Sequence, residues 1–105
     1  MYGTQFGVAF CYVSHHALWV ERDANLLILG ARVRALRTEK GLSQEKLADL
    51  SHVHRNFIGF IERGERNVGV RTIIALAQAM ELPPSAIFEG CAFEPVGPDE
   101  ADRSS

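Results

Sequence analysis

The stretch SQEKLADLSHVHRNFIGFIERGER, from Ser43 to Arg66, decides the fold of this chain. Its apolar residues recur at helical spacing in two short runs, one reaching about Leu50 and the other covering about residues 54–63. Between the runs, Ser51–His52–Val53 predicts a tight turn. Each run combines one apolar face with one polar, partly basic face. The residues that we expect to point inward are Leu47, Ala48, Leu50, Ile58 and Ile61.

Both runs carry residue types that begin and end helices. Ser43 is a preferred N-cap for the first run, and His54 is a weaker candidate cap for the second. Gly64 follows the second run in the position where a glycine often ends a helix. The stretch therefore predicts a helix, a turn and a second helix, which is the arrangement of a helix-turn-helix unit.

A longer helix precedes this unit. Asn25 is a candidate N-cap, and Gly41 has the position of a glycine that ends a helix. The apolar face of this helix consists of Leu26, Leu29, Val33 and Leu36.

Two further helices are predicted after the unit. Val70 or Arg71 opens the first of them, and Pro83–Pro84 ends it, because the residue before a proline is pushed out of the α region. Its apolar stripe is Ile73, Ile74, Ala77 and Met80, with Leu76 beside it. Ser85 to Phe88 forms the last short helix, in which Ile87 and Phe88 are expected to close the core. These five segments predict an all-α domain over residues 26–89.

The charge is unevenly distributed, although the formal net charge of the 105 residues is only −2. From Leu26 to Arg66, eight Lys or Arg residues stand against five acids, a local charge of +3. From Glu89 onward there are five acids and only Arg103, so we expect residues 90–105 to form an acidic, flexible tail. A basic middle suits a nucleic-acid partner, and an ordinary solvated surface is the alternative.

Residues 1–25 form an N-terminal extension whose first 20 residues contain no Asp, Glu, Lys or Arg. Val8–Val13 has the composition of a short strand, which would need a partner strand, for example its copy in a second subunit. The alternatives are a poorly ordered extension or a later start of translation. The extension lacks the positive region of a signal peptide, and polar residues interrupt it too often for a membrane helix. We therefore expect an accessory arm and no membrane partner.

The sequence offers no arrangement of residues for catalysis or metal binding. Cys11 and Cys91 are far apart and have no metal-ligand spacing, which favours a reducing cytoplasm. A glycine-rich phosphate loop, paired carboxylates and a Ser/His/Asp arrangement are all missing from the pattern. We expect no metal, no cofactor and no enzymatic activity.

From Leu29 to Glu89, the chain resembles the phage-repressor and Cro-type helix-turn-helix family, also called the XRE family. The residues that carry the resemblance are Leu29, Gly30, Val33, Arg34, Leu36 and Arg37, then Gly41–Leu42–Ser43–Gln44–Glu45, Leu47–Ala48, Val53, Ile58, Ile61–Glu62–Arg63–Gly64, Arg66, Leu76–Ala77, Ala79–Met80 and Ile87–Phe88. The segment HRNFIGFIERGERNV is most similar to the controller proteins of restriction–modification systems. The resemblance implies a five-helix, lambda-repressor-type fold.

The resemblance assigns roles at the DNA. The third helix, about residues 54–63, would enter the major groove, with Arg55 and Asn56 reading guanine and adenine. Gly59 would allow close approach, and Phe60 would either touch a thymine methyl group or fold back on the protein. The expected phosphate contacts are Arg34, Arg37, Ser43, Gln44, Lys46 and Arg66.

Three further positions follow from the family pattern. Arg37 and Glu62 would form a partly buried ion pair that fixes the angle of the third helix. Ala48 would need to be small where two helices cross. His52 stands where the family usually has glycine, so we expect it to adopt a positive φ.

The resemblance implies a sequence-specific transcription regulator that binds double-stranded DNA as a homodimer on a two-fold operator, in the cytoplasm of a bacterium or on phage or nucleoid DNA. The helix from Val70 to Glu81, together with Ile87–Phe88, would form the dimer surface. The alternative is an antitoxin-like protein in which residues 1–20 bind a toxin partner and the rest represses its own operon.

Overall fold

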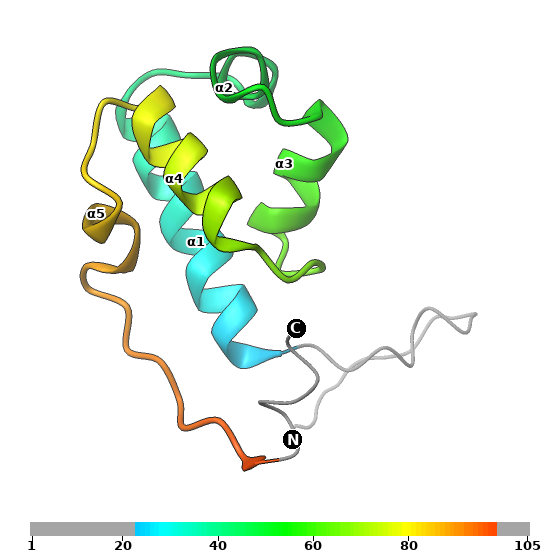
Figure 1. The fold of residues 1–105 in the computed structure, drawn as a ribbon, viewed down its shortest axis with the longest axis vertical. Helices are drawn as coiled ribbons and strands as arrows, with labels where there is room; N and C mark the ends of the chain where they lie inside the picture. Colours follow the sequence, from blue (N-terminus) through cyan, green and yellow to red (C-terminus); the bar gives the residue numbers. More distant parts are fainter. Residues whose placement is uncertain (1–22, 99–105) are drawn as a thin grey trace.

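The computed structural model describes residues 23–98, and this part of the chain contains five α-helices, whose arrangement is drawn in Figure 1. The helices are α1 (Ala24–Glu39), α2 (Gln44–Ser51), α3 (Arg55–Glu62), α4 (Val70–Ala79) and α5 (Ser85–Phe88). The prediction of an all-α, five-helix fold is confirmed. The expected strand at Val8–Val13 and the end of the expected tail, residues 99–105, lie outside the described residues.

Helix α1 begins two residues earlier than the sequence suggests. Asp23, and not Asn25, is its N-cap, and its Oδ1 accepts hydrogen bonds from the backbone N–H groups of Asn25 at 2.8 Å and Leu26 at 3.4 Å. The predicted cap at Asn25 is therefore wrong. Aspartate and asparagine are about equally good N-caps. Asp23 can therefore accept from the free N–H groups of the first turn, although it lies two residues further from the apolar run than Asn25.

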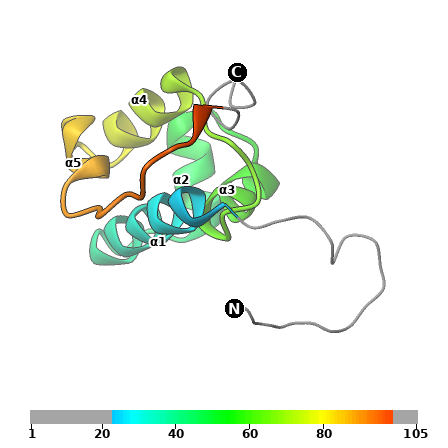
Figure 2. The same cartoon turned by 90° about the horizontal axis from the view of Figure 1, so that it is seen from below.

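Asn25 instead holds the segment that follows α5. Its side chain donates from Nδ2 to the carbonyl oxygen of Glu94 at 2.9 Å and accepts from the Glu94 N–H at 2.7 Å. Figures 1 and 2 show this segment returning from α5 toward the start of α1. The described part of the expected tail is thus anchored at Glu94, and its flexibility stays a prediction.

The core lies where the five helices meet. Helix α1 contacts α3 and α5, while α2 contacts α3 and α4 (Figure 1). Each helix contributes at least one almost fully buried apolar side chain. Met80, the residue directly after α4, contributes another. The largest of these side chains are Val33, Leu47, Ile58, Ile61, Leu76, Met80 and Ile87. Burial of one such side chain stabilises a fold by about 1.5–3 kcal/mol.

The inward face of α2 differs from the prediction at one position. Leu50 is 44% exposed, whereas Ser51 is 6% exposed. Ser51 lies four residues after the fully buried Leu47 and shares its face, because four residues are close to one helical turn. The Ser51 hydroxyl donates to the carbonyl oxygen of Leu47 at 2.7 Å, which satisfies this polar group inside the core.

Two expected core residues near the C-terminal end are exposed. Ile74 is 37% exposed, whereas Leu76 and Ala77 are the fully buried residues of α4. Phe88 is 44% exposed and meets Phe93 edge to face, with ring centroids 6.3 Å apart. At α5 the buried residues are Ala86 and Ile87, and Ile87 is the larger side chain that closes the core.

A close crossing of α1 and α3 sets the direction of α3. Gly30 is buried, and a methyl group at its Cα would overlap the backbone carbonyl oxygens of Ile61 and Glu62. Gly64 has φ +71°, and a Cβ there would stand only 2.9 Å from the backbone N and Cα of Leu27. Two glycines therefore let the C-terminal end of α3 rest directly on the first turns of α1. Within residues 23–98, no helix has the length and apolar character needed to span a membrane.

Candidate nucleic-acid interface

The turn before α3 is built on a left-handed histidine. His52 has φ 61° and ψ 30°, as the comparison with the usual glycine predicts, and its N–H donates to the carbonyl oxygen of Ala48. Ala48 is 5% exposed, which agrees with a close crossing of α2 and α3. The left-handed residue ends α2 and lets the chain turn directly into α3.

The N-terminal end of α3 faces solvent. His54 caps this end, and its Nδ1 accepts a hydrogen bond from the Asn56 N–H at 3.1 Å. Arg55 and Asn56 are both exposed. The Arg55 side chain is 63% exposed, and its Nη1 lies 3.5 Å from Oε2 of Glu45 on α2. The two expected base-reading side chains thus stand at the open end of the helix.

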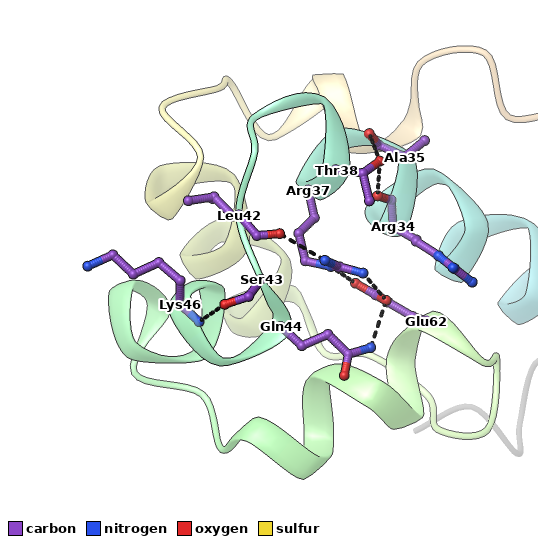
Figure 3. A network of polar contacts seen from close by, with 9 residues as sticks. All are labelled: Arg34, Ala35, Arg37, Thr38, Leu42, Ser43, Gln44, Lys46 and Glu62. Atoms are coloured by element: carbon purple, nitrogen blue, oxygen red, sulfur yellow. Dashed lines mark hydrogen bonds and ion pairs between the residues drawn. The ribbon is translucent and has the colours of Figure 1, made fainter.

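An ion pair joins α1 to α3. Arg37 donates from Nε to Oε2 of Glu62 at 2.6 Å and from Nη2 to Oε1 at 3.1 Å (Figure 3). The side chains are only 11% and 3% exposed. Two parallel hydrogen bonds between a guanidinium and a carboxylate fix both groups in one plane. The structure therefore contains the ion pair that the resemblance implies.

The same ion pair is tied to α2. Gln44 Nε2 donates to Glu62 Oε1 at 3.0 Å, and Arg37 Nη1 donates to the Leu42 carbonyl oxygen at 2.8 Å (Figure 3). One carboxylate thus accepts hydrogen bonds from residues of α1 and α2 while belonging to α3. This network, Arg37–Gln44–Glu62, holds the first residue of α2 against the last residue of α3.

Ser43 completes the N-terminal end of α2. Its backbone is extended, with φ −78° and ψ 166°, and its Oγ accepts from the Lys46 N–H at 2.9 Å. The positive end of the helix dipole therefore lies beside the exposed end of α3, where it favours an anion.

The middle of α3 differs from the prediction at Gly59. This residue is on the outer face of α3 but is buried, because the Arg63 side chain covers it: a Cβ there would stand 3.0 Å from Nη1 of Arg63. Phe60 is half-buried, with the guanidinium of Arg63 5.4 Å and that of Arg66 4.9 Å from its ring centroid. Of the two expectations for Phe60, contact with the protein's own surface is the one that this geometry shows.

A hollow of about 550 Å³ lies between the start of α2 and the outer face of α3. Its lining residues are Arg37, Ser43, Gln44, Glu45, Arg55, Asn56, Gly59, Phe60 and Arg63. Seven of the expected site residues are thus brought together. Arg34, Lys46 and Arg66 are exposed but do not line the hollow, and Figure 3 shows Arg34 and Lys46 extending away from the network.

Two residues of the hollow were absent from the sequence-based site. Glu45 belongs to it because it pairs with Arg55, a contact between two helices that residue spacing does not reveal. Arg63 follows Gly59 by four residues and Phe60 by three, so helical geometry places it on the same face. That spacing is the signal from which Arg63 could have been found. Among residues 23–98, no group of three or more His, Cys, Asp or Glu side chains could hold a metal ion.

Comparison with known proteins gives consistent matches. Residues 33–87, about half of the chain, match the family model HTH_3, helix-turn-helix. The control protein C.SmaI of Serratia marcescens is 51% identical over 53 residues, which cover 50% of this chain and 63% of that protein, less than two thirds of its length. The control protein C.BamHI of Bacillus amyloliquefaciens is 39% identical over 64 residues, covering 60% of this chain and 79% of that protein.

A solved structure extends the likeness to the fold. The restriction-modification controller protein C.AhdI from Aeromonas hydrophila superposes with a TM-score of 0.61 at 49% sequence identity. The match covers 62% of this chain and 98% of the chain of C.AhdI. The helical unit described above is therefore shared over nearly the whole of that smaller protein.

Proposed function

The chain belongs to the helix-turn-helix family, and from this premise we propose that it is a sequence-specific, DNA-binding regulator of transcription whose helix α3 reads the major groove. One observation carries the proposal. The exposed, basic end of α3 stands beside the N-terminal end of α2, and the Arg37–Gln44–Glu62 network fixes the two helices to α1. A rigid scaffold of this kind presents side chains to DNA in one orientation.

Arg55 and Asn56 are the proposed base-reading residues. An arginine donates two hydrogen bonds to O6 and N7 of guanine, and an asparagine pairs with N6 and N7 of adenine. Their position on the first turn of α3 supports this role, because the first residues of a recognition helix reach furthest into the groove. Arg55 would exchange its contact with Glu45 for the base edge.

The proposed phosphate contacts surround these residues. Ser43 and Gln44 offer the N–H groups at the start of α2, and Arg37 adds charge behind them. Exposed Arg34, Lys46 and Arg66 would reach the flanking backbone. Such contacts set the register on the duplex and supply salt-dependent affinity without selecting a sequence.

We further propose that the protein binds as a homodimer to a two-fold operator in the cytoplasm. Exposed apolar side chains on α4 and α5 support a surface for a second copy. Val70 is 73% exposed, Ile74 37% and Phe88 44%. A dimer of this kind requires half-sites about one helical turn apart, roughly 34–36 Å.

The function is tested by binding to a duplex selected from random DNA and to a random duplex. Arg55→Ala is expected to lose about 5- to 150-fold in affinity for the selected site, equivalent to 1–3 kcal/mol, with little effect on the random duplex. Gln44→Ala removes the hydrogen bond from Nε2 to Glu62 Oε1, which fixes the start of α2 at the interface, and is expected to weaken both equally. An equal loss on both duplexes for Arg55→Ala would contradict the base-reading role.

The antitoxin-like alternative depends on residues 1–20, which lie outside the described residues. It stays a prediction. Purification of the full chain from its host together with one unrelated small protein would favour it over a regulator that acts alone.

A further inference from the structure

One aromatic ring on α3 carries two arginines. The Cζ atoms of Arg63 and Arg66 lie 5.4 and 4.9 Å from the centroid of the Phe60 ring, and both distances fall within the range of cation–π contacts. Phe60 is half-buried, while both arginines are exposed. The ring therefore connects the packed side of α3 to two cations on its surface.

Arg63 is held by more than the ring. Its guanidinium lies over Gly59, where a side chain would stand 3.0 Å from Nη1, and its Nε donates to Oε2 of Glu65 at 3.2 Å. The Arg63 side chain remains 54% exposed. The absence of a side chain at Gly59 thus leaves room for this guanidinium beside the helix.

We propose that Phe60 is a positioning residue: its ring holds Arg63 and Arg66 as a pair of cations that bind two DNA phosphates beyond the base-reading end of α3. The inference rests on the proposed DNA-binding function. It places Arg63 at the DNA interface. It also gives Phe60 a positioning role in place of the direct base contact that was the alternative for this residue.

The geometry favours phosphate over base as the partner of this pair. Phe60 follows Arg55 by five residues, a rise of about 7.5 Å along the helix and away from the end that enters the groove. Two guanidiniums already lie over the ring, which leaves less of it for a thymine methyl group. A guanidinium matches a phosphate with two parallel hydrogen bonds.

Stacking also explains why an aromatic residue is useful here. A long arginine side chain loses much rotamer freedom when it binds an anion. The ring orders both side chains before DNA arrives, so less freedom is lost on binding. Leucine would keep most of the apolar volume but would offer no π face, whereas tyrosine would keep the ring.

The test measures how affinity for the selected duplex depends on salt. Each phosphate contact contributes about 0.9 to the slope of log K against log[salt]. Arg63→Gln and Arg66→Gln are each expected to lower the slope by about 0.9, and Phe60→Leu by about 1 to 2. Phe60→Tyr should keep the wild-type slope, and no variant should change the selected sequence. Adding Phe60→Leu to the double variant Arg63→Gln/Arg66→Gln should change the slope no further.

Three outcomes would overturn the inference. The first is a wild-type slope in Phe60→Leu with relaxed preference at one base pair, which would show that Phe60 reads a base. The second is a further fall in slope when Phe60→Leu is added to the double variant. The third is an unchanged slope in both single arginine variants. This third measurement does not use Phe60→Leu, so it tests the phosphate contacts even if that variant fails to fold. Failure of the wild-type protein to bind any duplex would instead overturn the proposed function itself.

Discussion

At the scale of single residues, Glu62 connects the parts of the interface. Its carboxylate accepts hydrogen bonds from Arg37 at 2.6 and 3.1 Å and from Gln44 at 3.0 Å, and its side chain is 3% exposed. An ionised group so deeply buried is costly unless its partners are in place. The orientation of α3 therefore depends on one carboxylate with three hydrogen-bond donors.

We expect Glu62→Gln to destabilise the fold by about 3–5 kcal/mol, because it leaves Arg37 buried without its counter-charge and turns an amide N–H group toward a donor. Chemical unfolding would measure this loss. The matched control is Glu89→Gln, which breaks a pair between the exposed Glu89 and the half-buried Arg32 at 3.9 Å and should cost no more than about 1 kcal/mol. Similar losses in the two variants would contradict the role given to Glu62.

Glu45 should oppose DNA binding. It lies 3.5 Å from Arg55 in the free protein and lines the hollow that would face the duplex. Glu45→Gln removes a negative charge near the DNA phosphates and releases Arg55. Affinity for specific and random duplexes should rise by up to about fivefold, since an exposed pair of this kind contributes little. A titration of both duplexes measures the change, and a loss of affinity would show that Glu45 itself contacts the DNA.

At the scale of the elements, the sequence predicts where the helices lie, but it does not predict in full which side chains of each helix are buried. Ser43 and His54 cap α2 and α3 as predicted, since capping depends on adjacent residues. Leu50 was expected inside, but Ser51 takes that place because a hydroxyl can satisfy itself on the helix carbonyl of Leu47. The pattern of hydrophobic residues alone does not show that a serine can be buried in this way.

The candidate site shows the same division. The sequence predicts Arg55 and Asn56 on the first turn of α3, which depends on the helix-turn-helix unit alone, and the family resemblance predicts the pair that joins Arg37 of α1 to Glu62 of α3. The structure contains both features, while the roles of these residues at DNA stay predictions. Burial of Gly59 was missed because it results from where the guanidinium of Arg63 folds. Contacts between long, flexible side chains are set by the assembled surface and not by spacing in the chain.

The crossing of α1 and α3 makes a further prediction. Gly30→Ala places a methyl group against two backbone carbonyl oxygens, which cannot move as a side chain can. We expect a loss of about 3 kcal/mol or more in unfolding free energy, at or above the upper end of the usual range for overpacking. Gly69→Ala is the control, because nothing lies within 4 Å of a Cβ at that position. A near-neutral Gly30→Ala would mean that α3 is not held at this angle.

At the scale of the whole molecule, the fold separates two surfaces. The hollow between α2 and α3 gathers the polar and basic side chains, whereas exposed Val70, Ile74 and Phe88 lie on α4 and α5. Two copies joined through the second surface would present two α3 helices to one duplex. The residues that line the hollow all belong to the basic middle of the chain, from Leu26 to Arg66, although the net charge of the chain is only −2.

The central claim is that α3 reads base sequence, and selection from random DNA with the wild-type chain and Arg55→Ala in parallel tests it most directly. The wild type should enrich a two-fold site whose half-site centres lie about 10–10.5 base pairs, or a multiple of this spacing, apart. Arg55→Ala should enrich the same site without its preference for guanine at one symmetric position. An identical selected site for both proteins, or no enriched site for the wild type, would contradict the account.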